Sequence, residues 1–211
     1  MGPQRRGRTA NASNLEPEPV NTAGVDEAGR GCLAGPVVAA AVLWSPNYRL
    51  EGLTDSKKLS ATQRERLRGE LEDLLPSGHW AVGSASPAEI DEVNILQATY
   101  LAMHRAIAQL DPAPALLLID GNRFKAYPGI EHRCEVKGDA RFAAISAASI
   151  FAKTERDHIM RGLHADFPYY GWNQNMGYPS QGHRSALEAH GACTWHRRSF
   201  AWKPSQLRLN L

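Results

Sequence analysis

Four acidic residues could perform metal-assisted chemistry: Asp26, Glu27, Asp120 and Asp139. They stand near glycines, at the predicted ends of secondary-structure elements, where side chains from different elements can converge. Two Mg²⁺ or Mn²⁺ ions about 4 Å apart need several hard oxygen ligands, and carboxylates supply them. The pattern therefore predicts a site for two divalent ions that hydrolyses a phosphate ester bond.

The choice of the fourth acid depends on helix geometry, because Asp157 is a further candidate. Taken singly, Asp139 or Asp157 is more often a helix cap or a surface charge than a metal ligand. In a continuous helix, residues at this spacing would be about 27 Å apart at about 1.5 Å rise per residue, so both cannot bind one ion pair. We expect Asp139, which is nearer in sequence to Asp120.

Asp26 and Glu27 are adjacent, which restricts how they can share a site. Successive side chains of a regular strand point to opposite faces, so both reach one site only if the strand ends or bulges there. The turn Gly29-Arg30-Gly31 follows directly. We expect this turn to supply the irregularity.

The elements that must position these acids alternate between strands and helices. A capping-box pattern at Ser60 and Gln63 predicts one helix start, and Ser86-Pro87-Ala88-Glu89 predicts another. Five apolar residues that run into Asp120 predict a buried strand with a carboxylate at its C-terminal end. The expected strands are 21–26, 37–44, 79–85, 115–120 and 132–136, and the expected helices are 63–75, one starting at 86–89, 95–110, 140–158 and 180–189. The fold class is mixed α/β, with a central sheet whose early strands are antiparallel and which helices flank.

Composition sets the remaining limits. The chain has 211 residues, of which 43% are hydrophobic and 22% charged, as in ordinary globular proteins. We expect a disordered leader over residues 1–18, a catalytic domain over 19–168 and a substrate-contacting segment over 169–211. That last segment is basic, either to face a polyanion or simply as a solvated tail; its cations are Arg184, Arg197, Arg198, Lys203 and Arg208.

Cysteine number and hydropathy bear on location. Three widely spaced cysteines argue against a disulfide framework and favour a reducing cytoplasm. No secretory signal or membrane-spanning stretch is apparent. We expect a cytoplasmic protein, monomeric and without a membrane partner.

Several motifs together resemble bacterial ribonuclease HII. The resemblance covers roughly residues 20–203 and is most specific at its start. The matching motifs are Gly24-Val25-Asp26-Glu27-Ala28-Gly29-Arg30-Gly31, Ala34-Gly35-Pro36-Val37-Val38, Asp55-Ser56-Lys57-Lys58-Leu59-Ser60, Asn94-Ile95-Leu96-Gln97-Ala98-Thr99, Ile119-Asp120-Gly121, Lys137-Gly138-Asp139, Ala147-Ala148-Ser149-Ile150, Ala152-Lys153, Arg156-Asp157 and His196-Arg197-Arg198-Ser199-Phe200.

The resemblance implies a ribonuclease H-like fold with a C-terminal helical segment, and an endonuclease acting on RNA/DNA hybrids or on DNA that contains ribonucleotides. It implies cleavage 5′ to the ribonucleotide with 3′-hydroxyl and 5′-phosphate ends, and a role in ribonucleotide removal. The family's metal-binding carboxylates match Asp26, Glu27, Asp120 and Asp139.

The resemblance also implies the residues that bind substrate. Gly29-Arg30-Gly31 matches a turn whose backbone reads the ribonucleotide 2′-hydroxyl, a close approach that glycine permits. Tyr178 matches a tyrosine that stacks on a deoxyribose, although a packed loop tyrosine is the plainer interpretation. Lys57 and Lys58 match phosphate-contacting lysines, which would otherwise be a solvated pair.

This sequence departs from the family around Tyr178. The family usually has His-Lys before the Gly-Tyr pair and Thr two positions after the tyrosine, whereas this chain has Asn175-Met176 and Pro179-Ser180. One phosphate-contacting lysine is therefore missing. We expect an effect on affinity or on junction preference.

Other functions have weaker support. The spacing His190-x-x-Cys193-x-x-His196 suits zinc, but the sequence offers no fourth ligand. A non-catalytic nucleic-acid-binding module would gain nothing from four acids, which repel phosphate unless metal intervenes. A metal-dependent hydrolase of small phosphate esters is the third alternative, and competition with a hybrid duplex would distinguish it.

Overall fold

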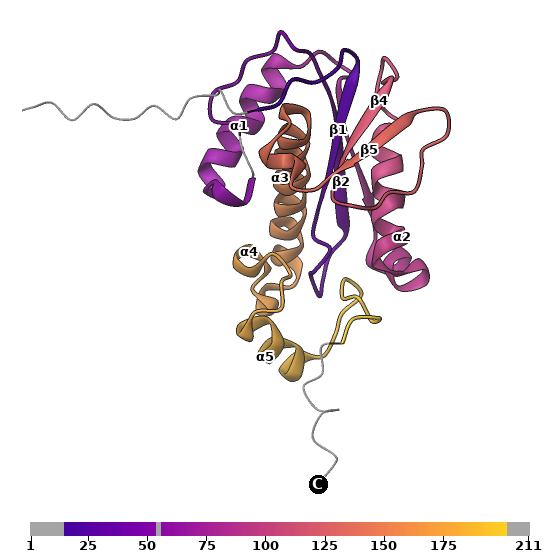
Figure 1. The fold of residues 1–211 in the computed structure, drawn as a ribbon. Helices are drawn as coiled ribbons and strands as arrows, with labels where there is room; N and C mark the ends of the chain where they lie inside the picture. The colour runs from indigo at the N-terminus through magenta and orange to yellow at the C-terminus, as the bar shows by residue number, and fades with distance from the viewer. Residues whose placement is uncertain (1–14, 54–55, 202–211) are drawn as a thin grey trace, which may run out of the picture.

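A five-stranded mixed sheet forms the centre of the molecule (Figure 1). The computed structural model describes residues 15–53 and 56–201. The sheet has the order β3-β2-β1-β4-β5; the strands are β1 (Thr22–Ala28), β2 (Val37–Trp44), β3 (Trp80–Ala85), β4 (Leu116–Asp120) and β5 (Glu131–Glu135). The first three strands pair antiparallel, and β4 and β5 run parallel to β1. The predicted α/β class with antiparallel early strands is confirmed.

Helices cover both faces of the sheet. The long helix α3 (Ala143–Asp166) and α1 (Ala61–Leu74) lie on one face, and α2 (Pro87–Ile107) lies on the other (Figure 1). Alternation along β2 explains the two cores: Ala39 and Ala41 pack in the cluster that includes α2, whereas Ala40 and Val42 pack in the cluster that includes α1 and α3. Both faces are apolar because both are covered.

A third, smaller core joins the C-terminal segment to the rest. The short helices α4 (Trp172–Asn175) and α5 (Gln181–His190) pack around the end of α3. Their apolar residues contact Leu33 and Ala34, which lie in the loop between β1 and β2. Ala34 also forms an isolated antiparallel bridge with His196. The loop after β1 therefore packs against residues about 150 positions later in the chain.

The helices on either side of Asn94 follow the prediction, whereas the long helix α3 differs in its bounds. The helices expected to start at 86–89 and at 95 are both present; they follow each other in α2 and are separated by a break at Asn94, where φ is 68° and ψ is 163°. The side chain of Asn94 accepts hydrogen bonds from the amides of Leu96 and Gln97, so it caps the second part of the helix. The helix expected over 140–158 begins at Ala143 and continues to Asp166.

The predicted leader is only partly covered. Residues 1–14 lie outside the described residues, as do Lys203 and Arg208. Glu16 pairs with Arg141 at 2.7 Å, and Glu18 accepts a hydrogen bond from the amide of Ala144 at the start of α3. Within the described ranges, no helix is long and apolar enough to cross a membrane.

Candidate metal-dependent active site

Three of the four predicted acids converge at the end of the sheet where the parallel strands β1, β4 and β5 finish. Asp26 lies on β1, Asp120 ends the parallel neighbour β4, and Asp139 lies in a 3-10 turn (Gly138–Ala140) after β5. One carboxylate oxygen from each lies within 4.8 Å of the others. Three carboxylates at this spacing are the hard donor set that Mg²⁺ or Mn²⁺ requires, so the residues fit a divalent ion.

Hydrogen bonds fix two of these carboxylates. Oδ1 of Asp120 accepts a hydrogen bond from the amide of Gly138 at 2.8 Å, which ties β4 to the turn that carries Asp139. Oδ1 of Asp26 accepts one from the amide of Glu27 at 2.7 Å. The donors are backbone groups, so the oxygens are positioned without a side-chain cation.

Glu27 occupies a different position from the other three acids. The expected strand end or bulge is wrong, because β1 pairs regularly with β2 through Ala28. Regular alternation turns Glu27 toward the α2 face, where it lines a cavity of about 330 Å³ together with Tyr100 and Asp120. Its carboxylate pairs with Arg30 at 3.2 Å. Glu27 thus lies at the rim of the cluster formed by the other three.

The electrostatics of the cluster are unfavourable without a cation. Burial, together with the negative charges of Glu27 and Asp120, raises the pKa of Asp26 well above its ordinary value. Burial also raises the pKa of Glu27, against the opposing effect of Arg30, and burial with the charge of Asp139 raises that of Asp120. Raised carboxyl pKa values at converging acids are typical of a site built around a positive charge.

Lysines surround the cluster. Nζ of Lys57 lies 3.4 Å from Oδ2 of Asp139, and its side chain is 76% exposed. Lys57, Lys58 and Lys137 line a cavity of about 370 Å³ with Asp120 and Asp139. Sequence reasoning gave no role to Lys137, whose left-handed backbone precedes the turn at Gly138. This region therefore combines acids that could hold a divalent ion with cations suited to phosphate.

The turn at Gly29-Arg30-Gly31 lies beside Asp26. A cavity of about 230 Å³ is lined by this turn, the acids Asp26, Glu27 and Asp120, and Tyr178. Tyr178 is 43% exposed, and the guanidinium of Arg156 lies 5.9 Å from its ring centre. All of the predicted metal-binding and substrate-binding residues except Asp139 and Lys58 line this one hollow, and those two line the cavity of about 370 Å³.

Two buried arginines hold the loop between β1 and β2 in place, and one of them bonds to the turn itself. Arg156, on α3, donates to the carbonyls of Pro36, Ala34 and Met176 at 2.8–3.0 Å. Arg197 donates to the carbonyls of Gly35 and Arg30. Arg197 is fully buried, so the interpretation that it faces a polyanion is wrong. Nothing in the sequence indicated that Arg197 is buried and bonded to backbone carbonyls, because a pattern of charges does not show which cations the fold buries.

The residues that depart from the family pattern have local structural roles. The side chain of Asn175 accepts a hydrogen bond from the amide of Gly177, and the carbonyl of Met176 accepts from Arg156. Ser180 caps α5 by accepting from the amide of His183. These contacts fix the backbone on both sides of Tyr178.

Asp157 and the zinc-like residues lie outside the acidic cluster. Asp157 is buried and pairs with Lys153 on α3 and with Arg64 on α1. His196 contacts His183 and Cys193, whereas His190 packs on Tyr169. Across residues 15–53 and 56–201, the only group of three or more such side chains placed to hold a metal is Asp26, Asp120 and Asp139.

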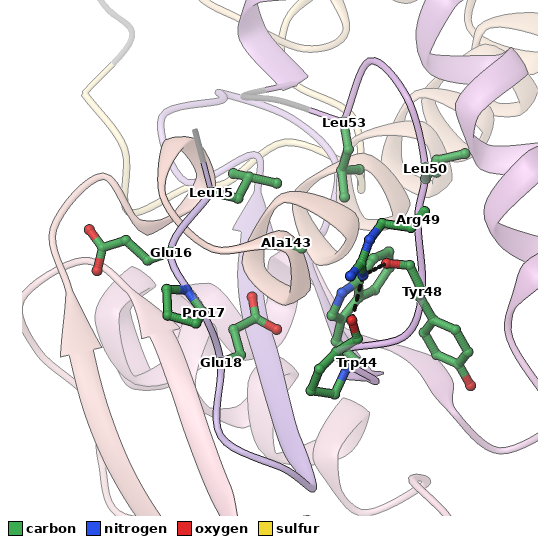
Figure 2. A pocket seen from close by; sticks show the side chains of 11 residues that line it. Leu15, Glu16, Pro17, Glu18, Trp44, Tyr48, Arg49, Leu50, Leu53 and Ala143 are labelled. Carbon is green, nitrogen blue, oxygen red and sulfur yellow. Dashed lines mark hydrogen bonds between the residues drawn. The ribbon is translucent and has the colours of Figure 1, made fainter. Parts of the chain in front are cut away.

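A larger cavity, of about 440 Å³, lies away from these acids. Figure 2 shows it between the segment before β1 and the loop after β2. Its walls include Leu15, Glu18, Trp44, Tyr48 and Arg49, and none of the predicted site residues. A search for the active site by cavity size alone would therefore point away from the converging acids.

Comparison with known sequences identifies many relatives of one kind. A family model described as Ribonuclease HII matches residues 23–203. A Ribonuclease HII from Bacteroides thetaiotaomicron is 52% identical over 189 residues, which cover 89% of this chain and 94% of that protein. One from Cytophaga hutchinsonii is 53% identical over 188 residues, 89% of this chain and 92% of that protein.

Solved structures agree in fold. Ribonuclease H2 from Pyrococcus horikoshii OT3 has a TM-score of 0.70 and 28% identity, with 86% of this chain and 94% of that chain covered. Ribonuclease HII from Archaeoglobus fulgidus, solved in complex with PCNA, has a TM-score of 0.73 and 28% identity, with 89% and 98% covered. This chain belongs to the ribonuclease HII family, metal-dependent hydrolases that cleave RNA in RNA/DNA hybrids.

Proposed function

We propose that this enzyme cuts 5′ to ribonucleotides embedded in duplex DNA as well as within longer hybrids, and leaves 3′-hydroxyl and 5′-phosphate ends. The observation that carries the proposal is the approach of Asp26, Asp120 and Asp139 to within 4.8 Å beside the Gly29–Gly31 turn. Such an enzyme would remove ribonucleotides from DNA in the cytoplasm, acting as a monomer.

The residues proposed to hold two Mg²⁺ or Mn²⁺ ions are Asp26, Glu27, Asp120 and Asp139. When bound, such ions supply an activated water and stabilise a leaving 3′-oxygen. Glu27, at the rim, has one oxygen paired with Arg30. We infer that Glu27 contributes its other oxygen.

The substrate would be positioned by groups around the acids. Lys57 and Lys58 would contact backbone phosphates, which fixes register without reading bases. Backbone groups of Gly29, Arg30 and Gly31 would approach the 2′-hydroxyl, the group that distinguishes a ribonucleotide from a deoxyribonucleotide. The 2′-hydroxyl would select the substrate and would not attack the phosphate.

A cleavage assay with and without EDTA tests this against the two rivals. We expect a hybrid to be cut in Mg²⁺ and left intact in EDTA, and a small phosphomonoester to be a poor competitor. A non-catalytic binding module would retain the hybrid uncut in both conditions. A hydrolase of small phosphate esters would bind the phosphomonoester at its active site, and the hybrid would fail to compete with it.

The two glycines of the turn give a matched pair of variants. A Cβ at Gly29, where φ is +94°, would collide with the side chain of Arg156, whereas a Cβ at Gly31 would meet nothing within 4 Å. We expect Gly29→Ala to destabilise the fold by about 1–3 kcal/mol. Gly31→Ala should keep its melting temperature and lose cleavage rate, because the added methyl group blocks the close approach of substrate. Thermal melting and single-turnover rates measure both effects, and unchanged cleavage by Gly31→Ala would contradict the proposed contact.

Tyr178→Ala tests the proposed stacking on a deoxyribose. Stacking of a base on an aromatic ring contributes about 1–3 kcal/mol, and we take the lower part of this range for a sugar packed on the ring. We expect this variant to weaken cleavage at a single embedded ribonucleotide by about tenfold or more, and cleavage within a long hybrid by less. Tyr169→Ala is the control, since Tyr169 is 46% exposed in the same C-terminal segment and packs on His190. Equal losses on both substrates would argue against stacking.

A further inference from the structure

One face of α3 points polar side chains into the hollow beside the acids. Ser149, Lys153 and Asp157 are spaced four residues apart, so they lie one above another on the helix. Ser149 and Lys153 line the cavity of about 230 Å³ together with Asp26, Gly29 and Tyr178. None of the three belongs to the group of acids proposed to hold metal.

Ser149 offers an unused hydrogen-bonding group. Its side chain is 3% exposed, and its Oγ has no hydrogen-bond partner. A buried hydroxyl without a partner is unfavourable, because it has lost its water and gained no other bond. A ligand oxygen in this cavity would satisfy it.

Lys153 brings a positive charge to the same wall. Its Nζ lies 2.5 Å from Oδ1 of Asp157, and the lysine side chain is 23% exposed. An ammonium group has three donors and no acceptor. The bond to Asp157 occupies one donor and fixes the direction of the others.

Asp157 links this lysine to a second cation. Its Oδ2 lies 3.9 Å from Nη2 of Arg64. Arg64 in turn donates to the carbonyls of Ser56 and Leu59, on either side of Lys57 and Lys58. One buried carboxylate therefore positions both the lysine in the cavity and the turn that carries two further lysines.

We propose that Ser149 and Lys153 form a subsite for a backbone phosphate of the nucleic acid, and that Asp157 is a positioning residue for it. Lys153, Asp157 and Arg64 together carry a net charge of +1, which suits a phosphodiester. The subsite lies in the same hollow that the Gly29–Gly31 turn, Asp26 and Asp120 line. This inference rests on the proposed function.

The salt dependence of binding tests the subsite. Hybrid binding is measured at several salt concentrations in an Asp120→Asn background, which prevents cleavage. Lys153→Met removes the charge and keeps the aliphatic stem, so packing is preserved. We expect binding to weaken about tenfold and the slope of log K against log salt to fall by about one, as for the loss of one phosphate contact. Lys153→Arg should restore the slope.

Controls separate the subsite from the proposed function. Arg66→Ala removes an exposed cation of α1 that pairs with Glu70, and it should leave both affinity and slope unchanged. An Asp120→Asn parent that fails to bind hybrid would contradict the proposed function and the subsite together. A parent that binds, with a slope that Lys153→Met leaves unchanged, would contradict the subsite alone.

A double-mutant cycle tests the role of Asp157. We expect Asp157→Asn to raise KM several-fold with little change in kcat when Lys153 is present, and to have a smaller effect in Lys153→Met, where only the contact of Asp157 with Arg64 is left to lose. Equal losses in both backgrounds would show that Asp157 does not act through Lys153. Thermal melting of each variant checks that the fold is retained.

Discussion

Asp120→Asn is expected to lower hybrid cleavage in Mg²⁺ by at least about 10²-fold while hybrid binding survives, the scale expected for loss of an electrostatic contribution to catalysis. The substitution removes the negative charge of Asp120, one of the three carboxylates that converge. Asparagine keeps an Oδ1 that can accept from the amide of Gly138, as Asp120 does at 2.8 Å. The fold should therefore persist while metal-dependent activity is lost.

The control for this prediction is Asp73→Asn. Asp73 is an exposed acid of α1, outside the cluster of three. It tests whether loss of one negative charge, irrespective of place, changes the rate. Full activity of Asp120→Asn at saturating Mg²⁺ would overturn the metal-site assignment.

Asp26→Asn is expected to abolish cleavage and yet stabilise the metal-free protein. The raised pKa of Asp26 means that its ionised form is disfavoured in the folded state, by burial first and then by Glu27 and Asp120. Asparagine removes that charge and keeps an oxygen for the amide of Glu27. We expect a higher melting temperature in EDTA, by about 2–4 °C for each kcal/mol recovered.

The same shift fixes the sign of the pH dependence. The pKa of Asp26 is higher in the folded state than in the unfolded state. The contribution of Asp26 to stability is therefore fully present at pH values below its unfolded-state pKa, and it is lost as the pH rises through its folded-state pKa. Metal-free wild type should therefore lose more stability between acidic and neutral pH than Asp26→Asn. Melting curves in EDTA across this range measure the difference, and parallel curves would contradict it. Mg²⁺ should raise the melting temperature of the wild type more than that of the variant.

Much of the site could be predicted because strand ends are visible in sequence. The apolar run before Asp120 identified a buried strand with a carboxylate at its C-terminal end, and β4 confirms it. Helical spacing argued that Asp139 and Asp157 could not share one site, nearness in sequence to Asp120 favoured Asp139, and only Asp139 joins the cluster. Asp139 does not lie at the start of the long helix, as that spacing assumed, but in a separate turn before α3. The conclusion survived because Asp157 lies far along α3.

The remainder could not be read from local pattern. A strand end or bulge was expected at Asp26 and Glu27, but the regularity of a strand depends on its partner, and β2 pairs with β1 through Ala28. Arg197 was expected either to face a polyanion or to belong to a solvated tail, but it is buried through its contacts with the loop after β1. Such long-range contacts leave no signal in residue spacing.

The most direct test maps the cut made in a DNA duplex that contains a single ribonucleotide. We predict one cut, 5′ to the ribonucleotide, with 3′-hydroxyl and 5′-phosphate ends, lost in EDTA and restored by added Mg²⁺. Cleavage that persists in EDTA, or a product ending in a 2′,3′-cyclic phosphate, would contradict the account, because the 2′-hydroxyl would then be the nucleophile and the converging carboxylates would have no metal-dependent role.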